Sequence, residues 1–132
     1  MNDREYRLAR LVRAMGEVVS ALEAKLVLGE RRLAGLSVMR SEIDSLASKA
    51  HPASLPAVLR SLTVLDAELE QALIEVESLR RQLLEAKGRE KVISVRLRLL
   101  RDEVERKVAE EQALEASLLM MAKASGKRGV VC

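Results

Sequence analysis

The chain is poor in the residue types from which globular cores and active sites are built. Its 132 residues include no Phe, no Trp, one Tyr, one His and one Cys. Aromatic side chains contribute much of the buried area in most globular domains, so a compact globular core is not expected. Metal sites and nucleophile–base pairs need His or Cys in larger numbers, and the chain has no glycine-rich phosphate loop, no HExxH and no CxxC. We therefore expect a protein that is not an enzyme and that binds no metal or cofactor.

Other absences concern location. No apolar run approaches the roughly 18 residues of a membrane-spanning helix, and the N-terminal MNDREYRLAR lacks the apolar region of a signal peptide. These features predict a cytoplasmic protein without a transmembrane segment. The single cysteine, Cys132, cannot form an internal disulfide, is not followed by a prenylation box and is expected to have no special reactivity.

The chain is rich in charge and in aliphatic residues. Charged residues make up 33% of it, and Leu, Ala, Glu and Arg are abundant, as in coiled coils. Hydrophobic residues recur at alternating spacings of three and four, which places one apolar stripe along a helix and favours its burial in a left-handed supercoil. The first such stripe comprises Leu8, Val12, Met15, Val19, Leu22, Leu26, Gly29, Leu33, Leu36, Arg40, Ile43, Ala47 and Ala50. The second comprises Leu55, Val58, Leu62, Leu65, Leu69, Ala72, Val76, Leu79, Leu83, Ala86, Glu90, Ile93, Leu97, Leu100, Val104, Lys107, Glu111, Leu114, Leu118 and Met121.

A proline-containing segment separates the two stripes. Pro52 and Pro56 each remove a backbone donor and disfavour helical geometry in the residue before them, and Ser54 is placed to cap the next helix. The sequence predicts a first helix over about residues 3–49, a turn over 50–56, a second helix over about 56–124 and a disordered tail over 125–132. Because so short a link favours antiparallel neighbours, we predict an all-α single domain, a long antiparallel two-helix coiled-coil hairpin.

The predicted helices differ in length, so part of the second should overhang. With the turn near residue 53, facing positions have numbers that sum to about 106, and Arg40 should lie opposite Asp66 or Glu70. Residue 3 then lies beside residue 103, and the apolar residues after Val104 have no partner helix. An exposed apolar stripe on one helix indicates a binding surface. The residues expected on this overhang are Val108, Leu114, Leu118, Leu119, Met120 and Met121.

A second set of apolar residues falls at outer heptad positions, where a plain hairpin should be polar. Val92, Val95 and Leu99 form its densest cluster. The cluster predicts a docking surface for another protein, although single exposed aliphatic residues are common on protein surfaces.

Basic residues are concentrated near the open end of the predicted hairpin. Such clustering attracts an acidic partner, whereas a solvated helix face is the favoured interpretation of any single residue. Nucleic acid is not the expected partner, because aromatic residues for base stacking and a forked basic region are both missing. The clustered residues are Arg4, Arg7, Arg10 and Arg13 on the first helix and Lys87, Arg89, Lys91, Arg96, Arg98, Arg101, Arg106 and Lys107 on the second.

The chain resembles one protein family in length and helix layout. Leu62, Leu65, Leu69 and Val76 lead into the segment LLEAKGREK at 83–91 and then into Leu97, Leu100 and Arg101. This pattern is similar to that of the FliJ/YscO stalk proteins of type III secretion, which are found in flagellar and injectisome systems. The second helix lacks the aromatic residues of the flagellar branch, which favours a virulence or symbiosis system.

The resemblance implies a component of an export apparatus. Such a protein would insert its helix termini into a hexameric secretion ATPase, contact the export gate membrane protein at the inner membrane and hand over secretion chaperones, and it would be a monomer when isolated. The overhanging Leu114, Leu118, Leu119 and Met121 would enter the ring. Two other classes remain open: a coiled-coil scaffold or adaptor that homo-oligomerises, and a peripheral binder of membranes or nucleic acid that acts through its basic helix faces.

Overall fold

The structure consists of two long helices joined by a short turn. The computed structural model describes the backbone of residues 2–131 and the side chains of residues 2–125. Helix α1 spans Asp3–Ala47 and helix α2 spans Leu55–Val131. No strand occurs in the described residues, so the predicted all-α class is confirmed. Contacts divide the chain into two units, which we call the hairpin unit, Arg13–Glu90, and the terminal unit, Met1–Val12 with Lys91–Cys132.

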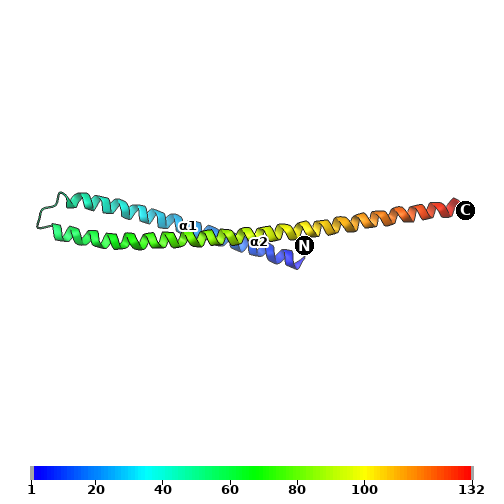
Figure 1. Ribbon diagram of the computed structural model, residues 1–132, viewed down its shortest axis with the longest axis horizontal. Coiled ribbons are helices and arrows are strands. Elements are labelled where there is room, and N and C mark those ends of the chain that lie inside the picture. Colours follow the sequence, from blue (N-terminus) through cyan, green and yellow to red (C-terminus); the bar gives the residue numbers. More distant parts are fainter. Residues whose placement is uncertain (1, 132) are drawn as a thin grey trace. The chain divides into compact units, whose positions relative to one another are not determined.

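The hairpin unit is an antiparallel pair of helices, which run side by side from the turn in Figure 1. Every predicted stripe position of α1 in this unit is buried or half-buried, and so is every predicted position of α2 except Leu55, in the first turn of the helix. Val76 is the most deeply buried side chain, with 0% of its surface exposed. The predicted pairing of the two apolar stripes is therefore confirmed.

Ion pairs across the hairpin agree with the predicted register. Arg40 donates its Nε–H to Asp66 Oδ1 at 2.6 Å, as the facing-position rule predicts. This hydrogen bond and the charge of Asp66 raise the pKa of Arg40 above its ordinary value. Exposed pairs of this kind add little stability but disfavour shifted registers, where like charges would meet. The other pairs across the unit are Arg32–Glu75 at 3.4 Å, Arg80–Glu30 at 3.2 Å and Lys87–Glu23 at 3.6 Å.

The turn between the helices is held by its own hydrogen bonds. The imidazole Nδ1 of His51 accepts from the Ala53 N–H at 3.2 Å, and the His51 carbonyl accepts from the Ser54 N–H at 2.8 Å. The Ser54 carbonyl accepts the first helical bond of α2, from Val58 N–H at 3.2 Å. The predicted capping role of the Ser54 side chain is thus not found among the hydrogen bonds of the described residues, because Ser54 acts through its backbone.

The terminal unit pairs the start of α1 with α2 for only part of its length. Leu97 is buried and Leu8, Val12, Leu100 and Val104 are half-buried, so the apolar stripes pair as far as Val104. Every residue from 105 to 125 is exposed. This confirms the predicted overhang, and we call residues 105–125 the bare end of α2 (Figure 1).

Both ends of the helical pair differ in detail from the prediction. The Asn2 side chain caps α1, its Oδ1 accepting from the Glu5 N–H at 2.8 Å. The second helix was expected to end near residue 124 and to be followed by a disordered tail, but α2 continues to Val131. The segment after 124 contains no proline, and its glycines weaken a helix by about 1 kcal/mol each without terminating it. Cys132 lies outside the described residues.

Gly29 is a point of close helix approach, and substituting it should destabilise the hairpin. A Cβ atom there would lie 3.2 Å from Val76 Cγ2 and 3.7 Å from Leu79 Cδ1, whereas one at Gly35 would meet nothing within 4 Å. We expect Gly29→Leu to lower the free energy of unfolding by about 1–3 kcal/mol through overpacking. Gly35→Leu should raise it by up to about 1 kcal/mol, because leucine has the higher helix propensity. Urea denaturation followed by circular dichroism at 222 nm compares the two; equal effects would contradict the packing of Gly29 against Val76.

Candidate functional site

The terminal unit contains an open groove that combines arginine and leucine side chains. Its volume is about 470 Å³. It is lined by Arg4, Arg7 and Leu8 of α1 and by Arg96, Leu99, Leu100 and Glu103 of α2. We call it the arginine groove.

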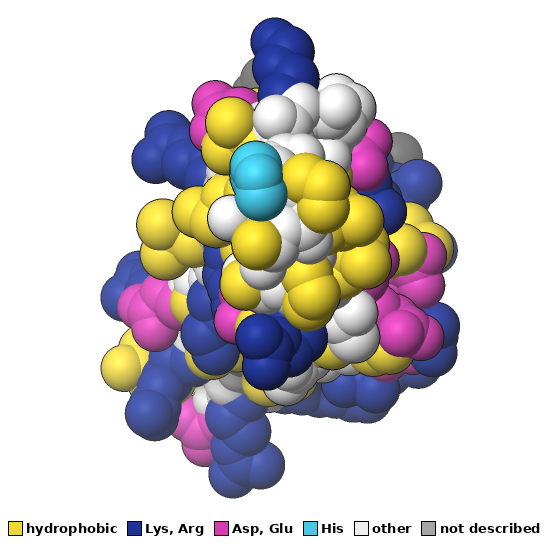
Figure 2. Space-filling view, turned by 90° about the vertical axis from the view of Figure 1, so that its left-hand side faces the viewer, with side chains coloured by type: hydrophobic (Ala, Val, Ile, Leu, Met, Phe, Trp, Pro, Cys, Tyr) yellow, Lys and Arg dark blue, Asp and Glu magenta, His cyan; other side chains and the backbone are white. Residues whose placement is uncertain are grey.

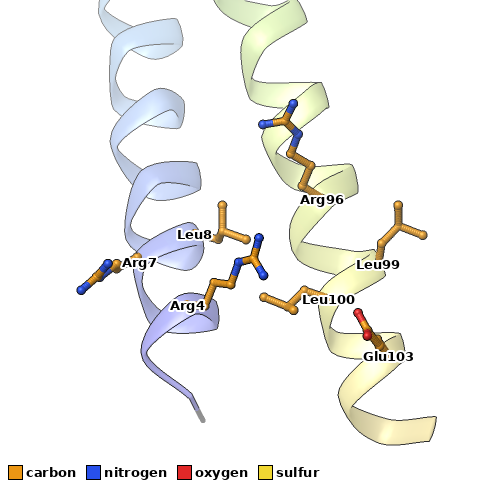
Figure 3. Close-up of a pocket in the computed structure, with 7 residues that line it drawn as sticks. All are labelled: Arg4, Arg7, Leu8, Arg96, Leu99, Leu100 and Glu103. Carbon is orange, nitrogen blue, oxygen red and sulfur yellow. The ribbon is translucent and has the colours of Figure 1, made fainter. Parts of the chain in front are cut away.

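The side chains of the arginine groove have distinct orientations. In Figure 3, Arg4, Arg96, Leu8 and Leu100 lie toward the space between the two helices, whereas Arg7 and Leu99 point away on either side. Leu8 and Leu100 are half-buried stripe positions near the start of α1, and they give the groove an apolar floor. Guanidinium groups therefore stand beside an apolar surface that is only partly covered.

The groove is positively charged. Within residues 2–125, no ion pair involves Arg4, Arg7 or Arg96. Glu103, the single acidic residue among the lining residues, forms an ion pair with Lys107 at 3.4 Å. Unpaired guanidinium groups favour carboxylate or phosphate groups, which they can bind through two hydrogen bonds at once. The groove can thus hold an acidic side chain next to an apolar one.

The bare end of α2 is the second part of the candidate site. It carries every overhang residue that the sequence predicts, Val108, Leu114, Leu118, Leu119, Met120 and Met121, and all of them are exposed. Leu114 exposes 62% of its surface and Met120 73%. Arg106 and Lys107 pair along the same helix with Glu110 at 3.8 Å and Glu103, which leaves less free charge here than the sequence suggests.

The structure brings together only some of the basic residues that were predicted to cluster. Arg4 and Arg7 line the arginine groove, but Arg10 lies over the ring of Tyr6, with its Cζ 5.9 Å from the ring centroid. Arg13 belongs to the hairpin unit, and Arg101 is exposed without lining the groove. The arginine groove therefore includes only some of the basic residues that the sequence places near the open end.

The predicted outer apolar cluster is also modified. Val92 and Leu99 are exposed, as expected, and Leu99 lines the arginine groove. Val95 is half-buried, which corrects its assignment to the exposed face. A short valine flanked three and four residues away by the longer Lys91, Arg98 and Leu99 is shielded by its own helix.

Sequence reasoning missed part of the groove. The helical spacing predicts that Leu8 and Leu100 belong to the paired stripe, but not that they line a groove. Glu5, which is only 7% exposed, is not part of the stripe that the spacing predicts. Glu5 lies three residues before Leu8, so extending the three-and-four spacing by one step would have included it. The sequence places Arg96 among the basic residues of the open end but does not predict that it lines a groove with Arg4.

Two features of the described residues bear on other kinds of site. No group of three His, Cys, Asp or Glu side chains in them is arranged to hold a metal ion. Among the helices as described, none has a stretch long and apolar enough to cross a membrane.

Comparison of the chain with protein-family models, with curated proteins and with solved structures gave no match.

Proposed function

We propose that the protein is a non-enzymatic central stalk of a type III secretion export ATPase. The observation that carries the proposal is the bare end of α2, where the apolar stripe continues past the end of its partner helix with every residue from 105 to 125 exposed. A stripe of this kind needs a partner to cover it in water. The resemblance to the FliJ/YscO family implies that this partner is the hexameric ring of the secretion ATPase.

The two parts of the candidate site make different kinds of contact with the ring. The bare end of α2 enters the ring and packs Leu114, Leu118, Leu119 and Met121 against an apolar collar. The arginine groove engages acidic side chains of the ring, which orients the stalk and speeds the encounter because opposite charges attract at long range.

The exposed Val92 and Leu99 are available for other contacts of the export apparatus. They suit the export gate membrane protein or a secretion chaperone, because exposed apolar side chains next to arginine, as at Leu99, are typical of protein interfaces. In this proposal the protein works in the cytoplasm, at the inner membrane, and converts the nucleotide states of the ring into ordered gating.

A homo-oligomeric scaffold is the second candidate, and the charges on the bare end favour one geometry for it. Lys107 and Glu111 occupy stripe positions there. In a parallel pair of copies each would face its own like charge, whereas an antiparallel pair can place Lys107 of one copy opposite Glu111 of the other. A second copy bound to the bare end would therefore run antiparallel.

Binding to the purified ATPase hexamer tests the proposal. Light scattering should give a monomer for the isolated chain and one chain per hexamer in the mixture. Arg4→Glu with Arg96→Glu should slow association about tenfold or more at low salt, with a smaller difference at high salt, because charge complementarity acts mainly on the association rate.

The control is a double variant with the same change in charge on the hairpin unit, away from the arginine groove. Lys25→Glu with Arg81→Glu alters two exposed basic residues of the hairpin unit and should leave the association rate within about twofold. A stable dimer or tetramer of the isolated chain that fails to bind the hexamer would contradict the stalk and favour the scaffold.

A further inference from the structure

The turn of the hairpin unit carries an exposed apolar surface that the proposed stalk function does not use. We call it the apolar tip; its members are Leu46, Pro52, Ala53, Leu55, Pro56 and Leu59, and all of them are exposed. Leu46 exposes 62% of its surface, Leu59 51% and Leu55 37%. Figure 2 shows this end of the hairpin, where hydrophobic side chains surround the single histidine.

Between residues 45 and 65, the segment that forms the apolar tip, the charged residues are all basic. No Asp or Glu occurs between Asp44 and Asp66, while Lys49 and Arg60 lie within that segment and are exposed. No ion pair within residues 2–125 involves Lys49 or Arg60. An apolar surface whose own segment of chain carries only cations complements a surface that is apolar inside and anionic outside.

Four backbone donors of the turn are already paired within it. The N–H groups of Lys49 and Ala50 donate to Leu46 and Ala47 at 3.1 and 3.4 Å, and those of Ala53 and Ser54 donate to His51. Pro52 and Pro56 have no N–H. Unpaired amides are costly to transfer out of water, and these hydrogen bonds and prolines lower that cost for the turn.

We infer that the apolar tip docks onto an anionic lipid surface. The leucines and prolines enter the boundary between headgroups and acyl chains, and Lys49 and Arg60 contact lipid phosphates. Peripheral membrane binding requires this combination, because either a small apolar insertion or a few cations alone holds a protein only weakly. The inference goes beyond the stalk function and does not depend on the ATPase.

Tryptophan at the tip provides a direct test, because the chain contains none. Full-length Ala53→Trp should show a blue shift of its emission with vesicles of phosphatidylcholine and 30% phosphatidylglycerol, and no shift with phosphatidylcholine alone. Ile74→Trp, at an exposed position on the side of the hairpin, should show no shift with either. A blue shift for both positions, or for neither, would overturn the inference.

Co-sedimentation with the same vesicles separates the apolar and charged contributions. Leu46→Gln with Leu59→Gln, and separately Lys49→Glu with Arg60→Glu, should each reduce the bound fraction about tenfold relative to the native chain at low salt. Ile74→Gln with Leu84→Gln and Lys25→Glu with Arg81→Glu, which make the same changes on exposed side faces, should change it less than twofold. Circular dichroism verifies that each variant is helical.

The outcomes distinguish lipid from other occupants. If the native chain does not bind anionic vesicles at low salt, the tip serves a protein partner or none and the inference fails. Equal losses in the tip and side-face variants would show non-specific attraction of a basic protein, which also overturns it. Binding to the ATPase hexamer is measured separately, so failure here leaves the stalk proposal unaffected.

Discussion

Val76→Asp should unfold the hairpin unit more strongly than any other single exchange of this kind. The Val76 side chain is fully buried between the helices and packs where Gly29 brings α1 close. A carboxylate there has no cationic partner and little access to water, so we expect the free energy of unfolding to fall by about 3–5 kcal/mol. Natural domains are stable by only about 5–15 kcal/mol, so the variant should lose much of its helix signal at 37 °C.

Ile74→Asp is the matched control for this substitution. It introduces the same carboxylate two residues away on the same helix, at a position with 60% of its surface exposed. This substitution should change the free energy of unfolding by no more than about 0.5 kcal/mol. Thermal and urea denaturation by circular dichroism measure both variants, and similar losses would contradict the pairing of the two apolar stripes.

The pH dependence of Val76→Asp identifies the cause of its effect. Burial raises the pKa of the new carboxyl group in the folded state above that in the unfolded state. The cost of burying the charge is therefore absent at pH values below the unfolded pKa of about 4, where the carboxyl group is neutral in both states. This cost grows as pH rises toward and through the folded pKa. Stability relative to Ile74→Asp should accordingly recover at low pH; a constant difference would indicate lost packing instead of a buried charge.

The sequence alone was sufficient to predict the paired part of the fold. The spacing of apolar residues decides which face of each helix is buried, and two prolines fix the place of the turn, so the register follows by counting outward from it. For this reason the Arg40–Asp66 pair and the end of pairing at Val104 could both be predicted. These are consequences of helix periodicity, and no knowledge of side-chain conformations was needed.

The details that could not be predicted depend on side-chain direction and on local competition. The arginine groove requires Arg4 and Arg96 to lie toward the space between the helices, and a long flexible side chain can point in several directions from the same helical position. Likewise, the side chains of His51 and Ser54 are both able to accept hydrogen bonds from backbone N–H groups of the turn. Helical spacing does not decide which side chain accepts them. The burial of Glu5 is not predicted because the stripe of the first helix is counted from its first apolar residue, Leu8.

The bare end of α2 should be dispensable for the hairpin and indispensable for binding to the ATPase. Leu114→Asp with Leu118→Asp places two carboxylates on a stripe that has no partner helix, so circular dichroism and the urea midpoint of the hairpin should barely change. In a complex the same carboxylates would be buried against an apolar collar. Because each disrupted anchor at the centre of an interface typically costs 2 kcal/mol or more, affinity for the hexamer should fall about 100-fold or more.

A double variant on the hairpin unit controls for charge and surface chemistry. Ile74→Asp with Leu84→Asp adds the same two carboxylates at exposed positions and should retain affinity within about threefold. Isothermal titration of the native chain and both variants with the hexamer gives the comparison. If both double variants bind like the native chain, the bare end is not the inserted segment. If the pair at 114 and 118 instead abolishes helix signal throughout the chain, those residues stabilise the fold, and their exposure in the isolated protein would have to be covered by a second copy.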